Sequence, residues 1–405
     1  MIVDFYSSEC PPCEALAPKF EALAAMYGDE VKFLKIFRQQ NRELATQLGV
    51  VSSPTLVFFD NGAQLPISLS GGIRKSEIVQ HLDSMLSPQV VETIRAKKEL
   101  LYTEYDVAIL GGGPAGLTAG IYLGQANIKT VLIDPALPGG FMGITHQVSN
   151  YPGFSTAQPG YMLAHHMSEQ AKNSGIDFRV AVDVSAVDLL KKEIVIDETE
   201  TIKAKKIIIA TGTTPKSLGA SGEKELKGKG ISFCATCDAK YFVDKEVIVI
   251  GSGNSAVEES LFITKFAKKV TLVYRSEKLK ANDTALELLA ANSKIELVSM
   301  HQAKAFVKKN DKVFVEFVNL NTKTTTTFTA DGVFSFIGFD ANISELGDHL
   351  PKTTQWGNII TDENMKTNMA DVYAIGDIVD KKYRQITTAV ADGTIAAISI
   401  STELN

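Results

Sequence analysis

The sequence is poor in cysteine, in long apolar runs and in excess positive charge, and each shortage argues against one class of protein. Four cysteines in 405 residues are far fewer than in secreted scaffolds held together by disulfides. No apolar run reaches the roughly 18 residues of a membrane-spanning helix. The net charge of −6 argues against nucleic acid as the main partner. The composition, 45% hydrophobic and 22% charged, is that of a globular protein, and the length predicts about three domains.

Targeting and metal signals are also missing. The N-terminus has an early acid, Asp4, and no basic segment, so we expect no signal peptide and a cytoplasmic location. The six histidines show no ligand spacing. A zinc ribbon is the alternative for the cysteines, but ribbons space their pairs about 15–20 residues apart, and here most of the chain separates them. We therefore expect no metal site.

All four cysteines lie in two Cys-x-x-Cys pairs, Cys10–Cys13 and Cys234–Cys237. This spacing favours a small disulfide ring that opens and closes, which suits redox exchange, with a plain structural disulfide as the alternative. Such pairs fit a reducing cytosol in which disulfides are catalytic. Asp238 follows the second pair directly and is a candidate proton donor to a leaving thiolate.

The N-terminal part predicts an α/β domain that begins with a buried strand over residues 1–7. Further strands are expected at 31–37, 55–59 and 64–69, and helices at 14–28 and 75–86. Cys10 then stands at a helix N-terminus, where the dipole and the free N–H groups lower a thiol pKa. The polar segment 87–103 is predicted to be a linker, partly helical.

A glycine-rich loop follows the next apolar strand, 105–110. Its glycines allow close approach to a pyrophosphate at a helix N-terminus, and the acid Asp134 at the end of strand 130–133 is placed to receive a ribose hydroxyl. The loop residues predicted to bind a dinucleotide are Gly111, Gly113, Pro114, Ala115 and Gly116.

A second loop of this kind follows strand 246–250, with Gly251, Gly253, Asn254, Ser255 and Ala256 as its predicted binding residues. Here the next strand, 270–274, ends without an acid. Arg275 and Lys280 follow instead, a pattern that suits a 2′-phosphate better than a free ribose diol. The alternative interpretation of these two cations is a solvated basic surface.

The N-terminal part resembles thioredoxin in Val3-Asp4-Phe5, Cys10-x-x-Cys13, Pro18, Lys35, Ser53-Pro54-Thr55 and Gly71. The resemblance implies that Cys10 is the exposed nucleophile and Cys13 the resolving thiol. It also implies a buried Asp4 that moves protons to Cys13 with Lys35 as its partner, and a cis Pro54 facing the thiols. The sequence departs from the family at Glu9 and at the Pro11-Pro12 dipeptide between the two cysteines. It also lacks the family's usual first strand and helix, which would leave one edge of the sheet uncovered.

Residues 104–402 closely resemble low-molecular-weight thioredoxin reductase, from the loop at Gly111 through Cys234-Ala-Thr-Cys-Asp238 to Ala374-Ile-Gly-Asp377. The resemblance implies a FAD domain at 104–215 and 340–405, an NADPH domain at 216–339 inserted between, and a homodimer. Cys237 would lie against the flavin, Cys234 would be the interchange thiol and Asp238 the acid. The fold class is therefore α/β: a thioredoxin fold plus two Rossmann-like dinucleotide-binding domains.

The same resemblance assigns further residues to the cofactor. It implies that Asn150 faces the isoalloxazine, Asp377 binds the ribityl chain, and the segment 384–386 closes over the flavin; the residues concerned are Gly140, Asn150, Gly376, Asp377, Arg384, Gln385 and Ile386. The sequence departs from the family at Phe141, near the flavin, and at Ser276, where the phosphate signature has a cation.

The expected activity is a thioredoxin-disulfide reductase with its own fused thioredoxin. Electrons would pass from NADPH to FAD, to Cys234–Cys237, to Cys10–Cys13, and then to client disulfide proteins, among which a peroxiredoxin is one candidate. A peroxiredoxin reductase like the alkyl hydroperoxide reductase flavoprotein is a close alternative, although that family uses NADH and a doubled N-terminal fold. Two further alternatives are a flavin-dependent reductase that receives its electrons from ferredoxin and a redox-sensing module without catalytic activity.

Overall fold

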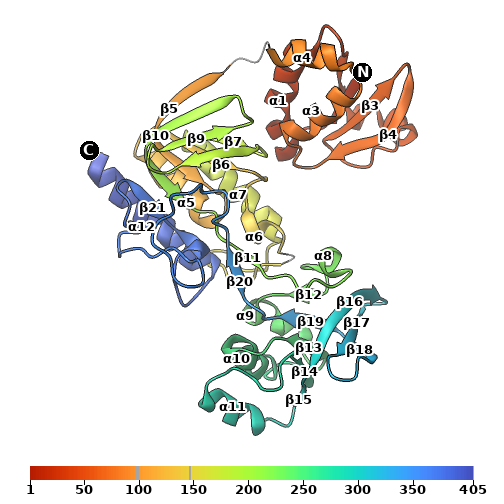
Figure 1. Cartoon of the computed structure of the whole chain (residues 1–405), viewed down its shortest axis with the longest axis vertical. Helices are drawn as coiled ribbons and strands as arrows, with labels where there is room; N and C mark the ends of the chain where they lie inside the picture. Colours follow the sequence, from red (N-terminus) through yellow and green to blue (C-terminus); the bar gives the residue numbers. More distant parts are fainter. Residues whose placement is uncertain (97–99, 146, 405) are drawn as a thin grey trace. The chain divides into compact units, whose positions relative to one another are not determined.

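The computed structural model describes residues 1–96, 100–145 and 147–404 (Figure 1). Residues 97–99 of the predicted linker, together with His146 and Asn405, lie outside that description. The chain forms two compact units. The first comprises residues 1–143, 161–212 and 341–405, and the second comprises residues 144–160 and 213–340.

The N-terminal domain of the first unit has the predicted thioredoxin fold. Its sheet runs in the order β2-β1-β3-β4, with β1 and β2 parallel and the other pairs antiparallel. The elements are β1 (Ile2–Tyr6), α1 (Pro11–Tyr27), β2 (Phe33–Phe37), α2 (Arg42–Gln47), β3 (Thr55–Asp60), β4 (Ala63–Ser70) and α3 (Lys75–Ser84). A short 3₁₀ turn (Arg38–Gln40) precedes α2. Neither of these two elements was predicted from the sequence.

Helix α1 packs on this sheet through an apolar stripe at helical spacing. Leu16, Phe20, Leu23 and Tyr27 are each at most 2% exposed. On β1, Val3 and Phe5 point to the opposite face, toward α2, because side chains alternate along a strand. Asp4 therefore shares the α1 side of the sheet.

The first half of the predicted linker is helix α4 (Pro88–Ala96), and it packs on the N-terminal domain. Ile94 is 4% exposed and joins the core under α1 and α3. Arg95 pairs with Asp83 at 2.7 Å, and the Tyr27 hydroxyl donates to the same carboxylate. Only four residues, 97–100, then separate α4 from the next strand.

The rest of the first unit is a dinucleotide-type domain, called here the first dinucleotide domain. Its sheet order is β7-β6-β5-β10-β9-β8, with β21 beside β10; β21, β10, β5, β6 and β7 are parallel. The strands are β5 (Leu101–Leu110), β6 (Thr130–Asp134), β7 (Asp177–Val180), β8 (Val184–Asp188), β9 (Glu193–Ile196), β10 (Glu200–Ile209) and β21 (Val372–Ala374). The helices are α5 (Pro114–Gln125), α6 (Gly140–Gly143), α7 (Gly160–Asn173) and α12 (Ile386–Leu404).

Helices α5 and α12 cross at a glycine. A Cβ at Gly393 would lie 2.3 Å from Ala115 O, so the close approach of the helices requires glycine there. Ala115 stands in the first turn of α5, next to the predicted dinucleotide loop. Helix α12 therefore packs against the first turn of α5, next to the loop.

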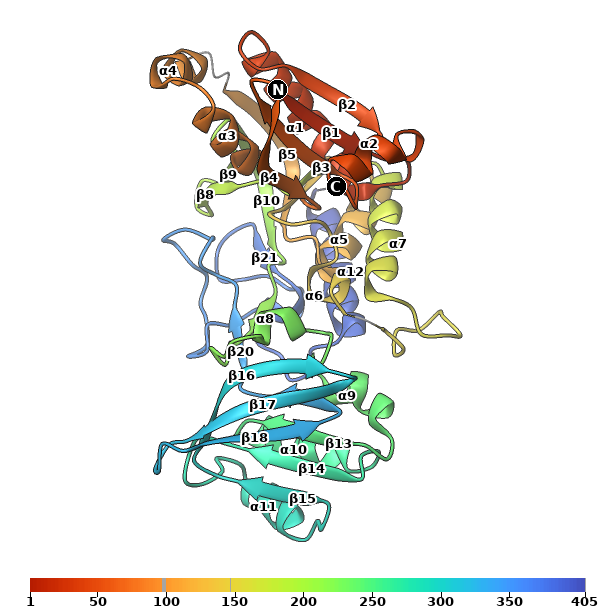
Figure 2. The same cartoon turned by 90° about the vertical axis from the view of Figure 1, so that its right-hand side faces the viewer.

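The second unit contains a parallel sheet and a small antiparallel one, both visible in Figure 2. The parallel order is β12-β19-β13-β14-β15, built from β12 (Ile231–Ser232), β13 (Glu246–Ile250), β14 (Lys269–Val273), β15 (Ile295–Val298) and β19 (Gly332–Ser335). The antiparallel sheet consists of β16 (His301–Lys309), β17 (Lys312–Asn319) and β18 (Thr325–Ala330). The helices are α8 (Glu223–Leu226), α9 (Ala235–Asp238), α10 (Asn254–Ile263) and α11 (Asp283–Ala290).

Four smaller elements complete the part of the chain that the structure describes. They are the paired strands β11 (Thr213–Pro215) and β20 (Phe339–Ala341) and the 3₁₀ turns Ala239–Phe242 and Gly376–Ile378. Within the described ranges, no helix combines the length and the apolarity that crossing a membrane requires.

Candidate functional site

The first disulfide joins Cys10 and Cys13 on the opening turn of α1, with their Cα atoms 5.2 Å apart. Cys10 is the N-cap residue, and its Sγ accepts a hydrogen bond from Cys13 N at 3.3 Å. The predicted position of Cys10 at a helix N-terminus is confirmed. In the reduced state the same N–H groups and the helix dipole would favour a Cys10 thiolate.

A cis-proline loop adjoins this disulfide. The Ser53–Pro54 peptide bond is cis, as the resemblance implied. Cys10 Sγ lies 3.6 Å from Ser53 O, and Gly71 N donates to Pro54 O at 3.4 Å. The expectation that Cys10 is the more exposed thiol is wrong for this arrangement, because Cys10 is 7% exposed and Cys13 8%.

Asp4 is buried on β1, on the face that carries α1. It is 2% exposed, and its Oδ1 is an acceptor without a hydrogen-bond partner among the described residues. Burial raises the pKa of Asp4 from 3.8 to about 6, and the positive charge of Lys35 opposes that rise. Lys35 lies opposite Asp4 in the β1–β2 register, but its ion pair is with Glu21 at 3.3 Å, so it is not the direct partner that we expected.

The first glycine loop is shaped by close backbone approaches. Gly111 has φ +110°, and a Cβ there would lie 2.4 Å from Ala210 O. A Cβ at Gly116 would lie 2.0 Å from Gly111 O. Gly113, the N-cap of α5, meets open space instead, which leaves the helix N-terminus accessible to a ligand.

Two carboxylates belong to this loop region. Asp134, at the end of β6, accepts hydrogen bonds from Gly112 N at 2.5 Å and from Ala136 N at 2.7 Å, and burial raises its pKa to about 6. Asp377 follows Gly376, whose position would bring a Cβ within 3.0 Å of Ala115 at the start of α5.

Asp377 has a buried acceptor that is suited to bind a ligand. Its Oδ1 is buried with no hydrogen-bond partner among the described residues, and burial raises the pKa of the carboxyl group. Arg384 Nε donates to the backbone oxygen of Asp377 at 3.3 Å. A buried, unpaired acceptor beside an open helix N-terminus fits a ligand that brings both hydroxyls and phosphates, as FAD does.

Other predicted flavin residues lie near these. A Cβ at Gly140 would stand 3.3 Å from Gly113 Cα, so Gly140 adjoins the loop. Gln385 N donates to Thr388 Oγ1 at 3.1 Å at the beginning of α12, which starts at Ile386. Asn150 belongs to the second unit, and its contact with a flavin stays a prediction.

The second disulfide, Cys234–Cys237, opens helix α9 and repeats the geometry of the first. The Cα atoms are 5.3 Å apart, Cys234 is the N-cap, and its Sγ accepts from Cys237 N at 3.2 Å. Thr236 Oγ1 lies 3.3 Å from Cys234 Sγ. The cysteines and Asp238 are partly exposed.

Ser232 is a site residue that the sequence reasoning missed. Its hydroxyl donates to Asp238 Oδ2 at 2.5 Å and accepts from Cys234 N at 3.2 Å. Ser232 therefore connects the carboxylate to the backbone of the disulfide ring. The only signal in the sequence is a hydroxyl residue two positions before Cys234, at the end of a very short strand.

The second glycine loop is as constrained as the first. Gly251 has φ +154°, and a Cβ there would lie 2.4 Å from Phe336 O, whereas Gly253, the N-cap of α10, meets open space. Lys280 N donates to Ser252 O at 2.6 Å, which places the Lys280 backbone beside the loop. Arg275 and Lys280 are both exposed.

Within the loop, Asn254 Oδ1 accepts from Asn282 N at 2.8 Å, Ser255 is exposed and Ala256 is buried. No group of three or more His, Cys, Asp or Glu residues suited to a metal ion occurs in the part of the chain that the structure describes.

Comparison with known proteins agrees with this geometry. A family model described as pyridine nucleotide-disulphide oxidoreductase matches residues 105–393, and a thioredoxin model matches residues 1–84. The thioredoxin reductase of Peptoclostridium litorale is 44% identical over 303 residues, which cover 73% of this chain and 95% of that protein. The chain belongs to the thioredoxin reductases of the pyridine nucleotide-disulphide oxidoreductase family.

Two further relatives support the assignment. The thioredoxin reductase of Bacillus subtilis (strain 168) is 40% identical and covers 73% of this chain and 93% of its own length. The crystal structure of thioredoxin reductase from Streptococcus pyogenes has a TM-score of 0.69 at 35% identity, over 75% of this chain and 98% of that one. Family membership makes the chain an oxidoreductase and implies a flavin and a pyridine nucleotide as cofactors. The N-terminal domain is a thioredoxin domain.

Proposed function

We propose that the chain is an NADPH-dependent, FAD-containing thioredoxin-disulfide reductase that reduces its own fused thioredoxin domain. The observation that carries this proposal is the pair of disulfides of matching geometry, Cys10–Cys13 in the thioredoxin domain and Cys234–Cys237 in the second unit. Both open a helix with the first cysteine as N-cap. Each is therefore suited to give an activated N-terminal thiol and a second, resolving thiol.

The first dinucleotide domain would hold FAD. The open N-terminus of α5 would take the pyrophosphate, and Asp134 and the unpaired Asp377 would accept hydrogen bonds from hydroxyls. When bound, FAD supplies the two-electron step between the nicotinamide nucleotide and a disulfide. The residues proposed to hold it are Gly111, Gly113, Pro114, Ala115, Gly116, Asp134, Gly140, Asn150, Gly376, Asp377, Arg384, Gln385 and Ile386.

The second unit would hold the nucleotide donor. The open N-terminus of α10 at Gly253 would receive its pyrophosphate, as at the first loop. The exposed cations Arg275 and Lys280 would pair with a 2′-phosphate, which favours NADPH. The loop residues involved are Gly251, Gly253, Asn254, Ser255 and Ala256.

The thiol chemistry then balances in two exchanges. Two electrons and two protons convert Cys234–Cys237 to a dithiol. The Cys234 thiolate attacks Cys10 Sγ, the Cys10–Cys13 bond breaks, and Cys13 leaves as a thiolate that takes a proton. Cys237 attacks Cys234 Sγ in the mixed disulfide, which restores Cys234–Cys237 and releases Cys10.

Two carboxyl groups would move the protons. Asp238, held by the Ser232 hydroxyl, is placed to protonate a thiolate of its own disulfide ring. Asp4, whose pKa lies near 6, would exchange a proton with Cys13 behind the first ring. Pro54 would border the surface on which Cys10 meets a partner sulfur.

We further propose that the reduced thioredoxin domain acts on disulfide-containing client proteins in the cytoplasm, with a peroxiredoxin as one candidate, and that the chain works as a homodimer. Anaerobic reduction of the flavin by NADPH, NADH and reduced ferredoxin, compared side by side, tests the donor. We expect NADPH to be the fastest. A clear preference for NADH would instead favour the peroxiredoxin reductase alternative, and a preference for ferredoxin would overturn the donor assignment.

The electron route is tested by removing both resolving thiols, with Cys13→Ser and Cys237→Ser. The remaining thiols, Cys10 and Cys234, should then be trapped as a stable disulfide under oxidising conditions. Peptide mapping after non-reducing electrophoresis identifies the bond, and a monomer-sized or dimer-sized band shows whether transfer is within or between chains. Absence of a Cys10–Cys234 peptide would mean that the fused thioredoxin domain is not the reductase's substrate.

A further inference from the structure

A lysine of helix α1 is buried where the thioredoxin domain meets the first dinucleotide domain. Lys19 is 8% exposed, and its Nζ donates to Ile73 O at 3.2 Å, to Val180 O at 2.8 Å and to Ala181 O at 2.6 Å. Three carbonyl groups thus match the three N–H bonds of an ammonium group. Two of them belong to the other domain, 161 and 162 residues away along the chain.

Carboxylates surround this ammonium group. Burial lowers the pKa of Lys19 to about 8, and the negative charges of Asp197, Asp183 and Glu77 oppose that fall. The group is therefore mostly protonated at neutral pH. A charged group at 8% exposure, bonded on both sides of an interdomain contact, ties the two surfaces together more firmly than an exposed ion pair does.

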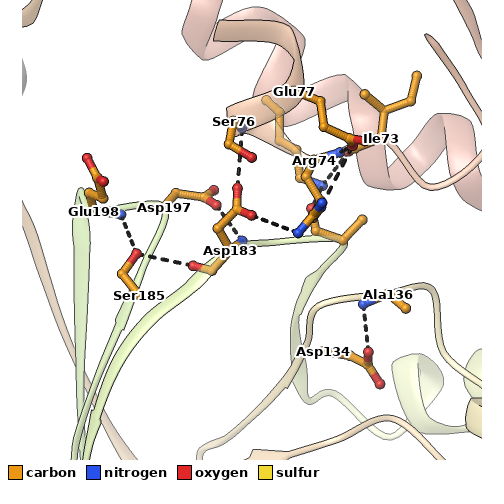
Figure 3. A network of polar contacts seen from close by, with 12 residues as sticks. Ile73, Arg74, Ser76, Glu77, Asp134, Ala136, Asp183, Ser185, Asp197 and Glu198 are labelled. Carbon is orange, nitrogen blue, oxygen red and sulfur yellow. Dashed lines mark hydrogen bonds and ion pairs between the residues drawn. The ribbon is translucent and has the colours of Figure 1, made fainter. Parts of the chain in front are cut away.

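Asp183 adds a second attachment on the same side (Figure 3). Its Oδ1 accepts from Arg74 Nη1 at 3.1 Å, and its Oδ2 accepts from Ser76 N at 3.3 Å at the start of α3. Asp183 is itself fixed, because its backbone N–H donates to Asp197 Oδ1 at 2.9 Å. One carboxylate of the first dinucleotide domain thus caps a helix of the thioredoxin domain.

Two weaker contacts flank these. Lys172 of α7 pairs with Glu14 at 2.9 Å; Lys172 is partly exposed and Glu14 is exposed, so this pair contributes little alone. Leu137 packs against Gly72, where a Cβ would lie 3.1 Å from Leu137 Cγ.

These contacts lie on the side of the thioredoxin domain that carries its disulfide. Glu14 is one helical turn beyond Cys10 on α1, and Gly72 follows the residue whose N–H bonds to Pro54 O. Cys10 and Cys13 are 7% and 8% exposed in this arrangement. A partner sulfur must come within about 2 Å of Cys10 Sγ to form a disulfide bond, and such low exposure leaves little room for that approach.

We infer that Lys19 and Asp183 hold the thioredoxin domain in a docked resting state on the first dinucleotide domain, in which Cys10 is shielded from reaction. The domain must undock before Cys10 exchanges with any disulfide, in this chain or in a client. This inference goes beyond the proposed function and does not depend on the identity of the electron donor.

The test measures how fast Cys10 is alkylated in the full-length, cofactor-loaded chain after chemical reduction and removal of the reductant. Iodoacetamide is the probe, and peptide mass mapping reports Cys10 separately from the other thiols. Lys19→Met removes the ammonium group and keeps most of the side-chain volume; we expect at least a fivefold faster reaction at Cys10. Asp183→Asn should act in the same direction.

Two matched controls remove the same charges elsewhere. Lys32→Met changes an exposed lysine just before β2, and Asp188→Asn changes a carboxylate that pairs with Lys191. Both should stay within twofold of the parent chain. If Lys19→Met and Asp183→Asn also stay within twofold, the docked state does not shield Cys10 and the inference is overturned.

A charge exchange between Arg74 and Asp183 tests the inference even if Lys19→Met fails to fold. Arg74→Asp alone should speed alkylation of Cys10, because it places a like charge beside Asp183. The double variant Arg74→Asp with Asp183→Arg should return the rate toward that of the parent chain. Failure of the double variant to restore shielding would also overturn the inference. No pyridine nucleotide is added in this assay, and it measures alkylation of Cys10 rather than the bond of Cys10 to Cys234. Its failure is therefore distinct from a failure of the Cys10–Cys234 trap.

Discussion

Replacing Asp4 by Asn should change how the stability of the thioredoxin domain depends on pH. Asp4 is 2% exposed, and its Oδ1 has no partner among the described residues. Burying its charged form therefore costs folding free energy. A pKa raised from 3.8 to about 6 means that the unfolded chain gives up this proton more readily than the folded one. Asp4 therefore destabilises the fold fully above pH 6, and the destabilisation disappears as the pH falls toward 4.

The size of the effect follows from the same values. Raising a carboxyl pKa from 3.8 to about 6 corresponds to about 3 kcal/mol, at about 1.4 kcal/mol for each pH unit. The free energy of unfolding of the Asp4→Asn variant, relative to the parent, should therefore rise by up to about 3 kcal/mol between pH 4 and pH 7. Asn adds a buried amide whose cost is independent of pH, so the change with pH is the diagnostic quantity.

Calorimetry of the oxidised full-length chain between pH 4 and pH 8 measures this difference, with the transition of the thioredoxin domain followed separately because a chain of several domains does not unfold in one step. Asp60→Asn, at the exposed end of β3, is the control and should show no comparable change. A relative stability of Asp4→Asn that varies by less than about 1 kcal/mol over this range would refute the reasoning.

Three further predictions concern the reductase. Arg275→Ala should raise the KM for NADPH severalfold and leave that for NADH nearly unchanged in steady-state assays; equal loss with both donors would show that Arg275 does not bind the 2′-phosphate. Asp238→Asn should keep the flavin bound but slow turnover about 10²–10⁴-fold, and a variant within twofold of the parent would remove Asp238 from the mechanism. Gly116→Ala should lower the flavin content of the purified protein, because a Cβ would lie 2.0 Å from Gly111 O; full flavin content would contradict the assigned loop.

The features that the sequence predicted well are those that a short stretch decides. The position of Cys10 at a helix N-terminus follows from a buried strand, two prolines and an apolar helical stripe, all within one segment. The glycine loops at Gly111 and Gly251 were predicted for the same reason, since a strand, a tight turn and a helix follow one another directly.

The features that were missed depend on residues far apart in the chain. A lysine on a helix is ordinarily a surface residue, and nothing near Lys19 shows that the backbone of Val180 and Ala181 covers it. The polar stretch after Ser87 was predicted as a partly helical linker, and its helix is present. The packing of that helix was missed because Ile94 and Val90 contact a core built elsewhere in the sequence. Family resemblance did not help with either, because both features concern the junction of two domains.

The tight packing of α4 yields a last prediction about this junction. Five Cα–Cα steps join Ala96 to Leu101, so the two fixed points lie at most about 16–18 Å apart. A connection this short keeps the thioredoxin domain at an effective concentration on the order of millimolar or above near its docking surface. Contacts that would be weak between separate molecules then suffice to keep the domain docked.

Inserting about 30 Gly/Ser residues between Leu100 and Leu101 should lower that effective concentration and leave every docking residue unchanged. The effective concentration falls roughly as the −3/2 power of connection length, so an eightfold longer connection lowers it about 20-fold. Cys10 in the lengthened chain should be alkylated faster, in the same direction as in Lys19→Met, and combining the two changes should add little once the domain is undocked. A rate equal to that of the parent chain would mean that the contacts at Lys19 and Asp183 hold the domain without help from the short connection.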